Sequence, residues 1–92
     1  MITAFVMIQT APSAATGLAT QLTQIEGVAE VYSVTGEWDI IAIVRLADYE
    51  QLARTVPDQI GSLPGIARTS TVLAFRSYTK EELAATWDIG LS

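Results

Sequence analysis

QIEGVAEV, residues 24–31, is followed 38 positions later by SLPGIART, residues 62–69. Both stretches place a glycine, Gly27 or Gly65, directly before an apolar residue that can start a strand. The same offset aligns AFV at residues 4–6 with AIV at residues 42–44, so the order strand, helix, glycine, strand occurs twice. Two such units in a short chain predict an α+β domain of βαββαβ order, with both helices on one face of the sheet.

The first unit predicts a strand over residues 2–9, because apolar side chains occupy both of its alternating faces. Pro12 and Ser13 then favour the start of a helix, with Ser13 as its N-cap. Gly27 is expected to end that segment in a left-handed conformation. A second strand is expected over residues 28–35.

The second unit predicts a strand over residues 38–46, which leaves only residues 36–37 for a tight antiparallel turn. Asp48 is expected to open the second helix. Pro57 lies inside this helix and should kink or split it just before the proline, because proline lacks an amide donor. The last strand is expected from Ile66 to about Tyr78.

The chain is short and unusually apolar. Its 92 residues predict one domain over residues 1–92, with residues 79–92 as a helical tail. Half of the residues are apolar and only 16% are charged, whereas soluble domains carry about 25% charged residues. Because Phe5, Met7, Ile41 and Ile43 would make the sheet apolar on its side away from the helices, we expect self-association.

Charge and missing residue types exclude several functions. The net charge is −5 and the five basic residues are scattered, so direct binding to nucleic acid by this chain is not expected. The chain has no cysteine and no histidine, which excludes disulfides, thiolate chemistry and the commonest metal ligand and general base. No catalytic, metal or cofactor motif is recognisable, and we expect no enzyme. Without an apolar run of about 20 residues or a basic leader, a cytoplasmic location is expected.

The candidate binding site is the turn between the two middle strands. Glycine lets backbone amides approach a ligand closely, turn amides can bind a carboxylate, and Asp39 can accept from an ammonium group. Three hydroxyls on the last strand, those of Thr69, Ser70 and Thr71, could orient a polar ligand. The spacing of these residues alone favours a simpler explanation, an ordinary hairpin turn and an ordinary half-buried strand.

TGEWD at residues 35–39, the apolar strand after it, and LPGIARTST at residues 63–71 together resemble a known family. They are similar to the C-terminal effector domain, or RAM domain, of the Lrp/AsnC (feast/famine) transcription regulators. The resemblance covers roughly residues 2–78. It implies a ferredoxin-like fold, dimers formed by packing of the sheets, and assembly of dimers into rings that are often octamers.

In that family, amino acids bind in the groove between dimers. The resemblance therefore implies that the ligand-binding residues here are Gly36, Glu37, Trp38 and Asp39, with Thr69, Ser70 and Thr71 opposite. Full-length members carry a helix-turn-helix domain, whereas this chain starts at the first strand and resembles a stand-alone RAM protein. DNA binding is then not transferred. Two roles stay open instead: modulation of a DNA-binding relative through mixed assembly, or the sensing or buffering of a metabolite.

Two other interpretations stay open at this stage. The first is an enzyme of the dimeric α+β barrel type, such as a small monooxygenase, which would need a buried carboxylate as its base because histidine is absent. The second is a purely structural assembly module, with the same rings but an empty groove. The identity of the amino acid and the size of the ring are not encoded in any recognisable motif.

Overall fold

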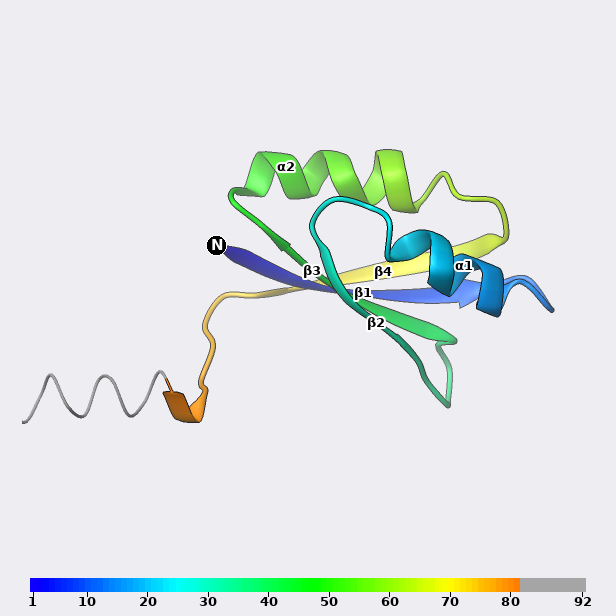
Figure 1. Ribbon diagram of the computed structural model, residues 1–92, viewed down its shortest axis with the longest axis horizontal. Coiled ribbons are helices and arrows are strands. Elements are labelled where there is room, and N and C mark those ends of the chain that lie inside the picture. Colours follow the sequence, from blue (N-terminus) through cyan, green and yellow to red (C-terminus); the bar gives the residue numbers. More distant parts are fainter. Residues whose placement is uncertain (82–92) are drawn as a thin grey trace, which may run out of the picture.

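The computed structural model describes residues 1–81. One antiparallel sheet of four strands has the order β2-β3-β1-β4, and the helical segments α1, α2 and η1 lie on one side of it (Figure 1). The elements are β1 Ile2–Thr10, α1 Ala15–Leu22, β2 Val28–Ser33, β3 Ile40–Leu46, α2 Tyr49–Arg54, the π-helical turn η1 Thr55–Ile60 and β4 Ile66–Ala74. The predicted βαββαβ order and ferredoxin-like α+β fold are confirmed. The predicted tail falls almost entirely outside the described residues.

The internal repeat is visible in the backbone. β1 and β3 begin at Ile2 and Ile40, and β2 and β4 begin at Val28 and Ile66, so both pairs of strands start 38 positions apart. Gly27 and Gly65, which precede β2 and β4, have φ angles of 94° and 93°. These left-handed angles favour glycine, so the two predicted glycines perform the same conformational task in each unit.

The core lies between the sheet and the helices. Alternate residues of the two central strands point to this side and are fully or almost fully buried, as the side-chain period of a strand requires. They pack with leucine and isoleucine side chains from the helical layer. The buried cluster consists of Ala4, Val6, Ile8, Leu18, Leu22, Ile40, Ala42, Val44, Leu46, Leu52 and Ile60.

Side-chain caps explain where α2 begins, and Pro57 explains where it changes to a π-helical turn. Asp48 Oδ1 accepts from the Gln51 amide at 2.9 Å, and Gln51 Oε1 accepts from the Ala47 amide at 3.1 Å, so both side chains satisfy amides at the helix start. The α-helix gives way to the π-helical turn at Thr55, two residues before Pro57. The expected split near Pro57 is confirmed.

Three predicted boundaries are wrong. Ser13 does not cap α1, because its φ of 71° belongs to a turn that is closed by the hydrogen bond from Ala14 N to Ala11 O. The turn between β2 and β3 is not limited to residues 36–37, since the connection spans residues 34–39. β4 ends at Ala74 rather than near Tyr78, because Ala74 already pairs with Thr3 at the start of β1.

The sheet face away from the helices is apolar at its centre. Phe5 of β1 stands between Ile43 of β3 and Val72 of β4, and it remains 37% exposed. Val72 is 50% exposed. The prediction that β1 and β3 are apolar on both faces is confirmed. Among residues 1–81, no helix has the length and hydropathy that a bilayer crossing requires.

Candidate ligand site at the β2–β3 hairpin

The connection between β2 and β3, residues 34–39, is a compact exposed loop, here called the hairpin loop. The amide of Val34 donates to the carbonyl of Asp39 at 3.0 Å and closes the loop at its base. Gly36 at the tip has a φ of 110°, and a Cβ atom added there would meet no heavy atom within 4 Å. The glycine is therefore required by the backbone angle rather than by crowding, and the loop tip is open.

Asp39 fastens the hairpin loop to the end of β1. Its amide donates to the carbonyl of Ile8 at 2.9 Å. Its carboxylate oxygen Oδ2 accepts from the Thr10 amide at 2.8 Å and from the Thr10 hydroxyl at 3.4 Å. Within residues 1–81, the second oxygen, Oδ1, accepts no hydrogen bond. Oδ2 thus has a structural role, whereas Oδ1 can still accept a hydrogen bond from a ligand.

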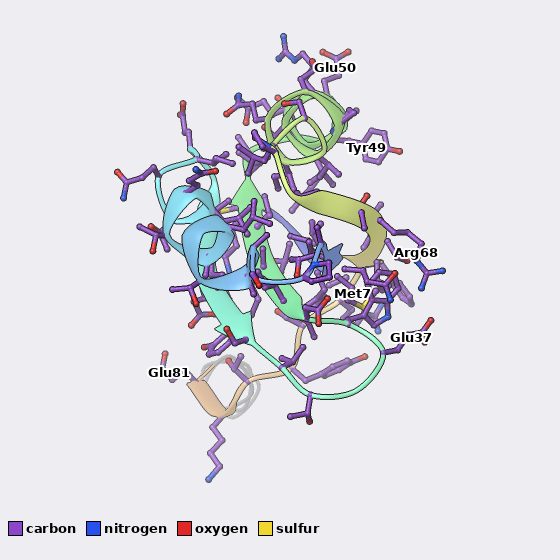
Figure 2. The ribbon with its side chains drawn as sticks, turned by 90° about the vertical axis from the view of Figure 1, so that its right-hand side faces the viewer. Met7, Glu37, Tyr49, Glu50, Arg68 and Glu81 are labelled. Carbon is purple, nitrogen blue, oxygen red and sulfur yellow. The ribbon has the colours of Figure 1, made fainter. Side chains whose placement is uncertain are left out.

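The side chain of Arg68, on β4, also contacts the hairpin loop. Its Nη2 donates to Glu37 Oε1 at 2.9 Å, and its guanidinium carbon lies 4.6 Å from the centroid of the Trp38 ring. Figure 2 shows Arg68 and Glu37 on the same side of the molecule. The Glu37 carbonyl also accepts from Gln9 Nε2 at 3.1 Å. The loop is therefore held by one cationic and one amide side chain from two neighbouring strands.

Neither Arg68 nor Gln9 is assigned to the site by the sequence argument. In the sequence, Arg68 is only one of five scattered basic residues. The two residues stand opposite each other in the β1–β4 ladder, so their common location follows from strand register. A sequence argument that aligned β1 with β4 would have found this pair.

The three predicted hydroxyls do not converge within the chain. Thr69 and Thr71 pair with Ile8 and Val6 and so lie on the helix side of β4, whereas Ser70 pairs with Met7 on the opposite face. Successive strand residues must alternate in this way. Ser70 alone of the three shares its face of the sheet with Arg68. The assignment of these residues to ligand binding stays a prediction.

The model of the Lrp/AsnC ligand binding domain matches residues 3–84. The chain belongs to the Lrp/AsnC family. An uncharacterised HTH-type transcriptional regulator of Pyrococcus horikoshii is 36% identical over 84 residues, which are 88% of this chain and 55% of that protein. The chain thus spans about half the length of the curated relatives that it matches. The resemblance seen in the sequence is confirmed.

Solved structures agree with this assignment. The protein TTHA0845 of Thermus thermophilus is 48% identical with a TM-score of 0.82, covering 87% of this chain and 100% of that chain. The leucine response regulatory protein of Mycobacterium tuberculosis is 27% identical with a TM-score of 0.74, covering 87% of this chain and 54% of that one. These relatives favour a regulatory domain over the alternative of a barrel-type enzyme.

Three surface hollows of this Lrp/AsnC domain lie away from the hairpin loop. The first hollow lies in the helical layer, over the end of β3. The second lies between the α2–η1 segment and β4, and the third lies between the start of β1 and the end of β4. The hairpin loop lines none of these three. Thr71 lines the second, beside Leu52 and Pro57. Across residues 1–81, no three metal-ligating side chains gather.

Proposed function

We propose that this domain binds a free amino acid at the hairpin loop and acts as a non-enzymatic regulatory module of a homo-oligomer. The observation that carries the proposal is that donors and an acceptor lie on the hairpin loop and on the β4 side chain that contacts it. Arg68 and the amides around Gly36 are donors, and Asp39 Oδ1 is an acceptor with no partner in residues 1–81. A zwitterion is the small molecule that needs both kinds of group at once.

The carboxylate of the ligand would bind at the Gly36 amides and at Arg68. The Arg68 guanidinium already holds a carboxylate, that of Glu37, at hydrogen-bonding distance. This pair is exposed, with 54% and 68% of the side chains accessible, and such pairs contribute little to stability. An incoming carboxylate can therefore replace Glu37 at small cost.

The ammonium group would bind at Asp39 Oδ1. Because Oδ2 is held by Thr10, the carboxylate is oriented before any ligand arrives. Orientation in advance lowers the entropy lost on binding. Trp38 would border the ligand side chain, since Arg68 fixes its ring by a cation–π contact.

A second subunit would complete the site. Residues Gly36 to Asp39 line none of the three hollows described above. The exposed apolar face around Phe5 and Val72 suits burial against another copy. We propose a sheet-to-sheet homodimer that assembles further into a ring, so that a neighbouring dimer covers the loop. Regulation would then pass to transcription through mixed assembly with a DNA-binding Lrp/AsnC relative.

A thermal-shift screen of the full chain against the twenty standard amino acids tests the binding claim. At least one amino acid should raise the melting temperature, and Asp39→Asn should abolish that rise while it keeps an oxygen for Thr10. If no amino acid stabilises the protein although light scattering finds an oligomer, the chain is a structural assembly module and the sensor claim fails.

A further inference from the structure

A separate cavity opens in the helical layer, far from the hairpin loop. It has a volume of about 330 Å³ and lies between the α2–η1 segment and the loop that follows α1, over the end of β3. Ligand pockets start at about 300 Å³. Leu46 lines the cavity at one end of β3, whereas the hairpin loop adjoins the other end at Ile40. At about 3.3 Å per residue, the two places are roughly 20 Å apart.

Thr55 gives this cavity a buried polar group without a partner. Only 6% of the residue is accessible, and its hydroxyl makes no hydrogen bond within residues 1–81. Within residues 1–81, every side-chain nitrogen or oxygen that is fully shielded from solvent has a hydrogen-bond partner. Because the Thr55 hydroxyl has no partner, it must keep some contact with solvent. Because Thr55 lines the cavity, we infer that the hydroxyl gains this access from the cavity.

The hydroxyl belongs to the residue at which the helix changes its hydrogen-bonding pattern. A threonine in a helix usually donates to the carbonyl four residues earlier. Here the Thr55 amide already donates to the carbonyls of Gln51 and Leu52, and the chain changes to the π-helical turn at this residue. Single π-helical turns occur often at functional sites.

Charged groups of both signs surround the cavity without neutralising one another. Glu26 comes from the loop after α1, Arg54 from the end of α2 and Asp58 from η1. In the described chain, ion pairs form only between Arg45 and Glu30 and between Arg68 and Glu37. One cationic and two anionic side chains therefore remain available to a bound molecule.

We propose that this cavity is a second binding site, for a small zwitterion with an ammonium and a carboxylate group. The ammonium faces Glu26 and Asp58, the carboxylate faces Arg54, and the Thr55 hydroxyl bonds a polar atom of the ligand from the floor. Two carboxylates disfavour a simple anion, and the Arg54 cation in the same lining disfavours a metal ion. An apolar ligand would leave the Thr55 hydroxyl unpaired.

Titration of the ¹⁵N-labelled full chain with each of the twenty standard amino acids, at millimolar concentration, tests the site. At least one should shift the amide signals of Thr55, Asp58 and Gln59. Thr55→Val removes the hydroxyl at nearly constant volume, and Arg54→Gln removes the cation from the exposed rim without touching the core. Each should weaken this binding about tenfold, the effect of one lost hydrogen bond to a charged group.

Three control variants identify the origin of the signal. Thr55→Ser should keep the affinity, while Thr16→Val and Lys80→Gln remove a hydroxyl and a charge elsewhere and should change nothing. Absence of shifts at Thr55 with every amino acid, or unchanged affinity in Thr55→Val and Arg54→Gln, overturns the proposal. If Arg68→Gln abolishes the shifts at Thr55, they are a consequence of hairpin binding and the second site does not exist.

The second site and the proposed function fail separately. Shifts at Thr55 that persist while the Gly36 amide stays unchanged would support the cavity and refute the hairpin site. Shifts at Gly36 alone would support the hairpin site and refute the cavity site.

Discussion

Arg68 Nη2 and Glu37 Oε1 lie 2.9 Å apart, although 31 residues separate them in the sequence. The pair joins an edge strand to the tip of a loop, and the Trp38 ring lies against the same guanidinium. Since both side chains are more than half accessible, the contact is easily exchanged. Glu37 can thus be regarded as an internal competitor for any carboxylate that Arg68 binds.

Removal of this competitor should strengthen ligand binding. Glu37→Gln leaves Arg68 without its anionic partner, and we expect the amino acid found in the thermal screen to bind roughly twofold to fivefold more tightly. Arg68→Gln should weaken binding about tenfold. Isothermal titration calorimetry measures both values, with Arg76→Gln as a charge-matched control. Weaker binding in Glu37→Gln would show that Glu37 contacts the ligand directly.

Asp39 should matter for stability through only one of its oxygens. Asp39→Ala removes the acceptor of the Thr10 amide, and we expect a loss of about 1.5–3 kcal/mol in the free energy of unfolding. Asp39→Asn keeps an oxygen for that amide and should lose clearly less. Urea denaturation of the two variants makes the comparison. Equal losses would mean that the negative charge, and not the Thr10 hydrogen bond, holds the loop.

The glycines should differ in their tolerance of a methyl group. At Gly65 the φ of 93° is unfavourable for alanine, and the added Cβ would lie 2.9 Å from the Ala14 Cβ. Gly36 shares the strained angle but has open space around it. We therefore expect Gly65→Ala to cost about 1–3 kcal/mol more than Gly36→Ala, the usual cost of overpacking.

Gly17 is a control position at which alanine should stabilise the protein. It lies in α1, and an added Cβ would meet no heavy atom within 4 Å. Alanine there should raise the free energy of unfolding by about 0.5–1 kcal/mol, because glycine is a poor helix former. Thermal unfolding of the three alanine variants in parallel checks the order. A destabilised Gly17→Ala would show that this helix face is covered in the assembly.

The exposed sheet face should decide the oligomeric state. Val72→Glu puts a charge beside Phe5, and burial of that charge against another subunit would be costly. We expect a lower molar mass in light scattering with unchanged circular dichroism. Tyr49→Glu is the matched control, because Tyr49 is 60% exposed but belongs to the helical layer. If the molar mass of Val72→Glu is unchanged, the interface between subunits lies on another surface.

The fold was predictable because it depends on a repeated pattern. The offset between residues 24–31 and 62–69 predicted the four strands, and side-chain alternation predicted the two faces of β1 and β3. Details set by single hydrogen bonds were not predictable. Ser13 has the chemistry of an N-cap, yet the bond from Ala14 N to Ala11 O places it in a turn.

The candidate site was predicted only where it is contiguous in sequence. Residues 36–39 form one loop, and their proximity needed no knowledge of the fold. Arg68 was missed as a site residue because its position depends on the register of β4 against β1. Thr69, Ser70 and Thr71 were grouped by sequence proximity, whereas strand geometry sends the middle hydroxyl to the other face.

The hairpin loop is tied to β1 by the Asp39 amide and carboxylate as well as to its own two strands. β1 is an inner strand, bonded along its length to β3 and β4, and it also carries Met7 and Phe5 on the far face. We therefore expect a displacement of the loop to be transmitted to the middle of the sheet. If the proposed amino acid binds at the loop, its binding would change the shape of the far face, and metabolite concentration would thereby act mechanically on quaternary structure.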